Sequence, residues 1–149
     1  MNARRSTPFV SLDGLNILIV EDEAVVSYLV EDMLQDLGCT AVWHASSVKE
    51  ALAILANSKP DAAVLDVNLR DELAYPVAEK LDKMEIPFIF ATGYGRRGIP
   101  ADWMVKPVVQ KPFDADALRD ALNIVLSRQD RIRDASMSHR QRGQGHNRS

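Results

Sequence analysis

Cysteine and histidine are scarce in this sequence. Cys39 is the single cysteine, and the three histidines are His44, His139 and His146. One thiol cannot close an internal disulfide, and these spacings do not suit a zinc site. The scarcity of cysteine favours a reducing compartment. We interpret Cys39 as a small buried residue at the start of a strand.

Long apolar runs are also absent. No run approaches the roughly 20 residues needed to cross a bilayer. Arg4 and Arg5 suggest a twin-arginine export signal, but Pro8 and Asp13 interrupt the stretch that would form its apolar region. The sequence therefore predicts a cytoplasmic protein without membrane association.

Positive charge is sparse except near the C-terminus. The chain has 18 Lys+Arg against 21 Asp+Glu, a net charge of −3. Residues 128–149 carry six arginines and two aspartates, so residues 1–127 are strongly acidic. Nucleic-acid binding needs a positive surface, so no direct nucleic-acid partner is expected for the acidic part. The basic tail leaves two interpretations open, a solvated disordered segment, which we prefer, or contact with nucleic acid or a membrane.

The size of the chain indicates one domain with tails. A chain of 149 residues, 46% hydrophobic and 26% charged, has the composition of an ordinary globular protein and can bury a sizeable core. We expect a flexible leader over residues 1–13, one domain over 14–127, and a basic, disordered tail over 128–149.

Five short apolar runs alternate with segments of helical periodicity. The runs are expected to be strands, and they cover residues 16–20, 40–44, 62–66, 88–92 and 108–110. Ser47 to Glu50 matches a capping box at the start of one helix, and Asp114 is a good N-cap for the last. Strands that alternate with helices form βαβ units with right-handed crossovers. The predicted fold class is α/β, a doubly wound parallel sheet with helices on both faces.

Polar side chains end four of these apolar runs. Glu21 and Asp22 follow the first run, Asp66 ends the third, Thr92 ends the fourth, and Lys111 follows the fifth. Open α/β sheets place their sites at the carboxyl edge of the strands, so these groups are expected to meet in one cleft. The set suits a divalent cation and a phosphoryl group.

The chemistry of these residues is that of phosphoryl transfer. Mg²⁺ prefers oxygen ligands, and Asp22 with Asp66 supplies a carboxylate pair that Glu21 can join directly or through water. A carboxylate can also be the nucleophile, and Asp66 is the better candidate because of its central strand. Lys111 and Thr92 can hold phosphoryl oxygens by charge and hydrogen bond.

Each of these residues also has an ordinary structural interpretation. An aspartate after a strand is usually a turn former or helix cap, and Glu21 with Asp22 could simply complement a helix dipole. Lys-Pro occurs twice, and we prefer Lys111 to Lys106 because an apolar strand precedes it. A cis bond to Pro112 is the geometry we expect there.

In this order the acids, the hydroxyl and the lysine resemble the receiver domain of two-component response regulators, over about residues 14–127. By that resemblance Asp66 is the phosphoacceptor, Asp22 is the metal-binding acid and Glu21 is its neighbouring acid. Asn68 falls where the family contributes a backbone carbonyl to the cation.

The other two site residues also match the family. Thr92 matches its switch hydroxyl, and Lys111 matches its lysine. The resemblance implies a flavodoxin-like receiver fold with five strands, Mg²⁺ as the cofactor, and a phosphoryl group received from a histidine kinase or a phosphotransfer protein. A receiver catalyses only its own phosphorylation and dephosphorylation, so no enzyme acting on another substrate is expected.

Two features depart from the usual pattern of the family. Val108 occupies a position where receivers usually carry Tyr or Phe, whose ring couples phosphorylation to surface shape. The stretch from Thr92 to Lys111 is short and glycine-rich, so the fourth helix is expected to be shortened or irregular. The run Phe-Ala-Thr-Gly-Tyr that ends at Tyr94 is similar to the signature of a receiver subclass. Tyr94 either takes the aromatic role or only packs against Trp103 or Pro107.

The expected output of this receiver is contact with another protein, or a role as phosphate sink or shuttle, because no DNA-binding or second catalytic domain follows in the sequence. Two rival functions remain open. One is a Mg²⁺-dependent phosphatase with an aspartyl nucleophile, although Asn68 cannot supply the proton that the haloacid dehalogenase type needs. The other is an interaction module that is never phosphorylated.

Overall fold

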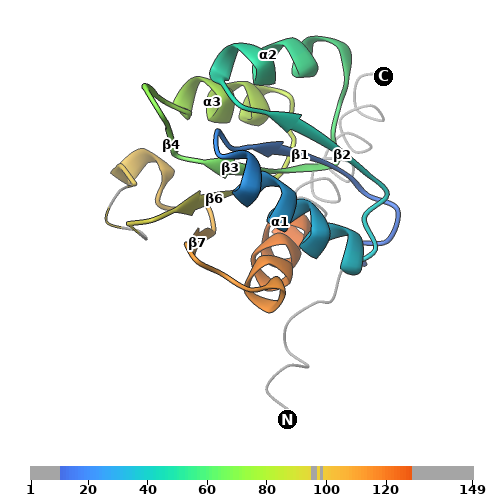
Figure 1. The fold of residues 1–149 in the computed structure, drawn as a ribbon. Helices are drawn as coiled ribbons and strands as arrows, with labels where there is room; N and C mark the ends of the chain where they lie inside the picture. Colours follow the sequence, from blue (N-terminus) through green and yellow to red (C-terminus); the bar gives the residue numbers. More distant parts are fainter. Residues whose placement is uncertain (1–10, 95–96, 98, 129–149) are drawn as a thin grey trace, which may run out of the picture.

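The computed structural model describes residues 11–94, 97 and 99–128 of the 149-residue chain. A five-stranded parallel sheet has the order β2-β1-β3-β6-β7 (Figure 1). These strands are β1 (Asn16–Val20), β2 (Ala41–Ala45), β3 (Ala62–Asp66), β6 (Phe88–Thr92) and β7 (Val108–Gln110). The order is that of doubly wound flavodoxin-like folds, so the predicted fold class is confirmed.

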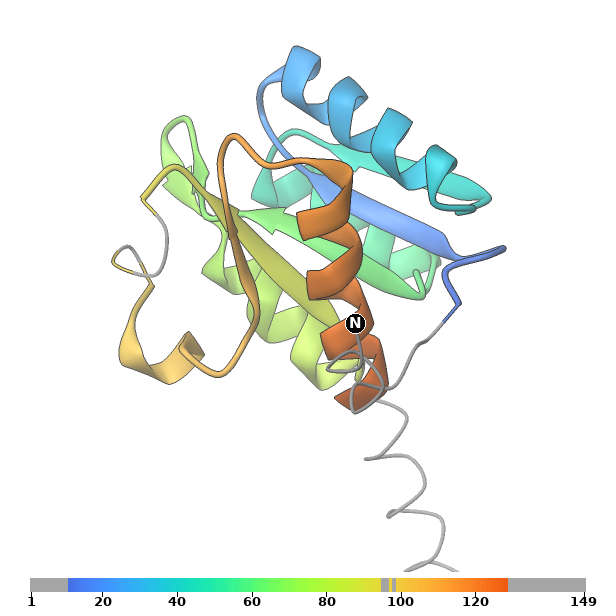
Figure 2. The same ribbon diagram turned by 90° about the horizontal axis from the view of Figure 1, so that it is seen from below.

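Helices cover both faces of the sheet. They are α1 (Ala24–Asp36), α2 (Val48–Asn57), α3 (Tyr75–Lys83) and a last helix over residues 115–128. Side chains of α1 and the last helix share one buried cluster, and those of α2 and α3 share the other. Figure 2 shows α1 and the last helix on the same side of the sheet.

The apolar strands are buried because both faces are covered. In β1, Ile17 and Ile19 belong to the cluster under α1, while Leu18 and Val20 belong to the cluster under α2. All five residues of β3 and of β6 are buried. Parallel strands between two helical layers therefore read as continuous apolar runs, with no alternation of polar residues.

Local signals fix the ends of two helices. Gly38 follows α1 with a φ of +103°, a backbone conformation that is strained for any residue with a Cβ and that favours glycine. At α2, Ser47 Oγ accepts a hydrogen bond from the Glu50 N–H at 3.1 Å, as the capping box predicts. The Glu50 carboxylate accepts from the Ser46 N–H at 2.7 Å, one residue earlier than the motif implies.

The segment between β6 and β7 contains no α-helix among its described residues. Its regular part is the 3₁₀ helix η3 (Ala101–Trp103). Trp103 stacks on Tyr75 with ring centroids 6.2 Å apart, and it also contacts Phe88 and Phe90. The prediction of a shortened fourth helix is confirmed, and an aromatic cluster holds this segment against β6 and α3.

A small hairpin stands where the sequence suggested only a polar loop before α3. The antiparallel strands β4 (Asn68–Leu69) and β5 (Glu72–Leu73) are joined by the two residues Arg70 and Asp71. Arg70 has a φ of +40°. Strands of two residues are too short to show a periodic pattern, which is why the hairpin was missed.

Cys39 lies between α1 and β2, and His44 lies within β2. Cys39 is buried as predicted, and burial raises the pKa of its thiol to about 11, so the thiol is protonated at neutral pH. His44 contacts Ser27 through Nδ1 and Glu31 through Nε2. Both contacts join α1 to the edge strand β2.

The proposed leader and tail are mostly outside the described residues. Residues 1–10 and 129–149 are not described, and the boundaries at 13 and 128 stay predictions. Leu12, at the start of the described chain, is buried in the core. Among the helices described here, none has the length and apolar content required to cross a bilayer.

Candidate functional site

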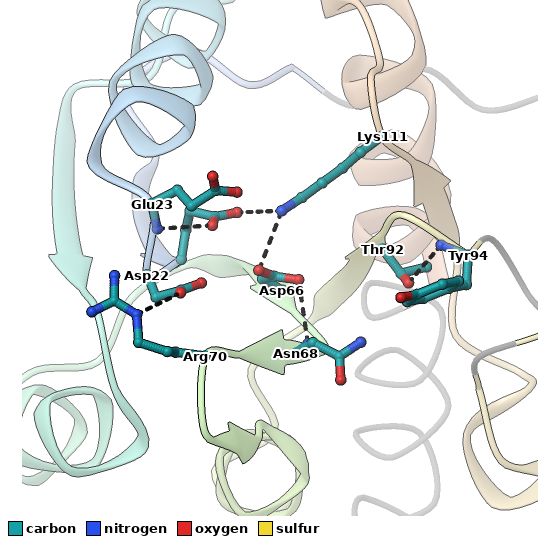
Figure 3. Close-up of polar contacts among 9 residues, drawn as sticks. Asp22, Glu23, Asp66, Asn68, Arg70, Thr92, Tyr94 and Lys111 are labelled. Atoms are coloured by element: carbon teal, nitrogen blue, oxygen red, sulfur yellow. Dashed lines mark hydrogen bonds and ion pairs between the residues drawn. The ribbon is translucent and has the colours of Figure 1, made fainter.

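The polar residues predicted to converge lie at the carboxyl edge of the sheet (Figure 3). Glu21 and Asp22 follow β1, Asp66 ends β3, Thr92 ends β6 and Lys111 follows β7. Adjacent parallel strands hold these ends in register, and the Lys111 N–H donates to the Thr92 carbonyl at 2.9 Å beyond the last residue of β7. The expected convergence of strand ends is confirmed.

Three carboxylates form the centre of the site. One oxygen each of Glu21, Asp22 and Asp66 lies within 4.8 Å of the others. Glu21 and Asp66 are buried, at 5% and 6% exposure, and Asp22 is half-buried at the mouth. Such close negative charges are mutually repulsive unless cations neutralise them.

Lys111 supplies one neutralising charge. Its Nζ donates to Glu21 Oε1 at 2.6 Å and to Asp66 Oδ2 at 3.2 Å. Lys111 follows the edge strand β7, and its ammonium thus links the acids at the ends of β1 and β3. The Lys111–Pro112 peptide bond is cis, as expected from the sequence. Lys106, the rejected alternative, pairs instead with Asp82 on α3.

The surroundings of Asp66 raise its pKa to about 6. Burial is the largest cause, and the negative charge of Glu21 adds to it. The charge and hydrogen bond of Lys111, together with the N–H of Asn68, oppose the rise. Asp66 is therefore predominantly ionised at neutral pH, at a cost in stability.

The pKa of Lys111 is raised as well. Burial alone lowers it, but the hydrogen bond to Glu21 and the charges of Asp66 and Glu21 outweigh burial. Lys111 is therefore a fixed positive charge at neutral pH. A fixed charge beside the Asp66 carboxylate can neutralise a phosphoryl oxygen without any proton movement.

Thr92 and Tyr94 lie on the other side of Asp66 from Asp22 (Figure 3). Thr92 is buried, and its Oγ1 accepts a hydrogen bond from the Tyr94 N–H at 3.1 Å. Tyr94 is 69% exposed. Trp103, the partner considered for it, contacts Tyr75, Phe88 and Phe90 instead. The hydroxyl of Thr92 is thus oriented by the backbone that leads to Tyr94.

Asn68 contacts the site through its backbone. Its N–H donates to Asp66 Oδ1 at 3.3 Å, which holds the carboxylate from the side of the β4–β5 hairpin. The predicted role of its carbonyl as a metal ligand stays a prediction.

Arg70 is a site residue that the sequence analysis did not identify. Its Nε lies 3.7 Å from Asp22 Oδ2, and 75% of its side chain is exposed. Within the described residues, ion pairs to the three carboxylates come from Lys111 and Arg70. The only sequence signal was a basic residue four positions after the candidate nucleophile, which is too common to single out.

The donor set fits a small hard cation. Each of the three carboxylates offers one oxygen, two from buried residues and one from the half-buried Asp22. Mg²⁺ takes few protein ligands and keeps several waters, so this group of oxygens suits it. Soft ligands are lacking in this group, which disfavours zinc or copper. Glu21, Asp22 and Asp66 are therefore the residues that would hold it.

A parallel β2-β1-β3-β6-β7 sheet with an acid triad and a lysine at its carboxyl edge defines a class of signalling domain. The family model of the response regulator receiver domain matches residues 17–123. This chain belongs to that family.

Known relatives agree with this assignment. The sensory transduction protein LytT of Enterococcus faecalis is 34% identical over 115 residues, which are 72% of this chain and 46% of LytT. The chain thus spans about half the length of the curated relatives it matches. SdrG from Sphingomonas melonis Fr1 is 42% identical with a TM-score of 0.69, covering 78% of this chain and 99% of that structure. The response regulator PhyR from Brucella abortus is 27% identical with a TM-score of 0.74, and the match covers 85% of this chain and 53% of the PhyR chain.

Proposed function

We propose that this receiver accepts a phosphoryl group on Asp66 with Mg²⁺ held by Glu21, Asp22, Asp66 and the backbone carbonyl of Asn68. The observation that supports this most strongly is the Lys111 ammonium, which bridges Glu21 and Asp66 within the carboxylate group. A lysine that served only to pack its apolar stem would leave its ammonium in solvent, whereas Lys111 contacts two buried acids that lie beside Asp22.

In the proposed reaction a carboxylate oxygen of Asp66 attacks the phosphorus of a phosphohistidine. The O–P bond forms as the N–P bond breaks, and the electron pair of that bond stays on the leaving imidazole nitrogen. Lys111 neutralises one phosphoryl oxygen, and the Thr92 hydroxyl donates to another. When bound, Mg²⁺ offsets the negative charge that the carboxylates and the phosphoryl group bring together.

Receiver membership implies a histidine kinase as the partner that supplies the phosphoryl group. We propose that the phosphorylated domain then acts through protein–protein contacts, or as a phosphate sink or shuttle, in the cytoplasm. The Phe-Ala-Thr-Gly-Tyr run from Phe90 to Tyr94 supports the signature subclass of receivers, and the absence of α-helix among the described residues between β6 and β7 agrees with it.

Phosphorylation by a small-molecule donor tests this function directly. The protein is incubated with Mg²⁺ and phosphoramidate, and its intact mass is measured. The wild type should gain one phosphate, and Asp66→Asn should gain none because the amide is not a nucleophile. Asp71→Asn, which removes an exposed aspartate of the neighbouring hairpin, should be phosphorylated as the wild type is.

Two results would contradict the proposal. One is a phosphate on Asp66→Asn at the wild-type level, which would place the acceptor elsewhere. The other is steady release of inorganic phosphate from a generic phosphate ester, which would favour the phosphatase.

A further inference from the structure

The β4–β5 hairpin is fastened at two places near the carboxylates. At its base the Asn68 N–H donates to Asp66, and Leu69 is buried. At its far strand the Glu72 carboxylate accepts from the Val48 N–H at 2.9 Å, at the first turn of α2. The two residues between these strands therefore have little freedom to move away from the site.

Arg70 occupies the first position of that two-residue turn. Its φ of +40° is a conformation that few residues other than glycine adopt. Strained backbone of this kind is concentrated at functional sites. Here it directs the Arg70 side chain toward Asp22, with Nε 3.7 Å from Oδ2 (Figure 3).

The two cations that face the carboxylates differ in how firmly they are held. Lys111 is 22% exposed and bonds two buried acids at 2.6 and 3.2 Å. Arg70 is 75% exposed and contacts one half-buried acid at a longer distance. An exposed pair is weak and screened by salt. Of the two, Arg70 is therefore the one that a competing cation displaces.

We propose that the Arg70 guanidinium competes with the divalent cation for the Asp22 carboxylate, and so lowers the affinity of the site for Mg²⁺. This inference rests on the proposed function, because it assigns Mg²⁺ to the same carboxylates. With Mg²⁺ held at the carboxylates, Asp22 would no longer be available to Arg70. The Arg70 guanidinium would then offer its N–H groups to an anionic phosphoryl donor at the mouth of the site.

Isothermal titration calorimetry with MgCl₂ tests the competition without any phosphorylation step. Arg70→Asn removes the charge and keeps a residue that tolerates a positive φ, and Arg70→Ala is the second variant. Both should bind Mg²⁺ with a Kd about two- to five-fold lower than the wild type, as expected for loss of an exposed pair. The difference should narrow at high ionic strength.

Arg119→Ala is the matched control. It removes one positive charge from the last helix, where Arg119 pairs with Asp116 and Asp120, away from the carboxylates. Its Kd should equal that of the wild type, and thermal unfolding of every variant shows that it is folded.

The possible outcomes distinguish failure of the Arg70 competition from failure of the proposed Mg²⁺-dependent function. An unchanged or higher Kd in both Arg70 variants overturns the inference and leaves the proposed function standing. An equal drop in the Kd of Arg119→Ala also overturns it, because general charge would then explain the effect. Absence of Mg²⁺ binding in the wild type and the variants alike overturns the cation site itself.

Discussion

At the scale of single residues, Asp66 is subject to two opposed demands. It must be ionised to act as a nucleophile, yet it is buried next to the negative charge of Glu21. The charge and hydrogen bond of Lys111 stabilise the ionised carboxylate, but the pKa of Asp66 still rises to about 6. The carboxylate that gives the domain its proposed chemistry is therefore also a source of instability in the ion-free state.

Replacement of Asp66 should reveal this instability as a pH-dependent gain. The folded protein holds the Asp66 proton more tightly than the unfolded chain, whose pKa is near the ordinary 3.8. The contribution of Asp66 to stability therefore decreases as the pH rises from about 4 to about 6. With a chelator present, Asp66→Asn should be more stable than the wild type at pH 7.5 by about 1–3 kcal/mol.

Urea unfolding at pH 7.5 and at pH 4.5 measures the difference. The advantage of Asp66→Asn should shrink at the lower pH, where the wild-type carboxyl is largely protonated in the fold. A difference in the free energy of unfolding that is the same at both pH values would contradict the electrostatic explanation.

At the scale of elements, the segment between β6 and β7 has two differently held parts. Residues 99–107 are fastened by Ile99, which is buried, by Trp103 in its aromatic cluster, and by Lys106, which pairs with Asp82. Closer to the site, Tyr94 is exposed. Because Val108 has no ring to move, we expect a response to phosphorylation to start where Thr92 meets this segment.

Phosphorylation of Asp66 is expected to order the segment from Tyr94 to Lys106, an order–disorder switch. The Thr92 hydroxyl would donate to a phosphoryl oxygen while it still accepts from the Tyr94 N–H, so the phosphoryl group would be linked through Thr92 to the backbone at Tyr94. Hydrogen exchange with and without beryllofluoride, a phosphoryl mimic, should show slower exchange of these amides. Amides of α2 serve as the internal control, and unchanged protection of the segment would refute the switch. Residues 95, 96 and 98 of this segment lie outside the described residues.

Most elements could be predicted from the sequence because their signals are local. β1, β3, β6 and β7 have the predicted bounds, since each is an apolar run ended by a polar group. The second strand covers Ala41–Ala45, one residue later than the expected 40–44, because residue preferences mark the end of an element only to within a residue or two. The hairpin and Arg70 could not be predicted, because their positions depend on contacts with α2 and Asp22 that are distant in sequence.

At the scale of the whole molecule, the site gathers charge that the fold alone does not neutralise. Three carboxylates face two cations, and the rest of the domain is acidic as well. Ligand binding to the folded state only must stabilise the whole domain, since the carboxylates are close together only when the sheet is formed.

Mg²⁺ should therefore raise the unfolding temperature of the protein. At ten times its Kd the ion adds about 1.4 kcal/mol to the free energy of unfolding, and a chelator removes the gain. Differential scanning fluorimetry over a MgCl₂ series measures it, with NaCl at matched ionic strength as the salt control. Asp22→Asn should lose most of the gain, and an equal gain in that variant would mean that the ion binds elsewhere.

The aromatic cluster has a practical consequence. Trp43 lies on β2 at one edge of the sheet, whereas Trp103 stacks on Tyr75 near the other edge, and the chain has only these two tryptophans. With Trp43 replaced by phenylalanine, the emission of the protein would come from the one indole that anchors the β6–β7 segment. The molecule thus contains a native fluorophore, and stopped-flow fluorescence can follow that segment in real time without any attached dye.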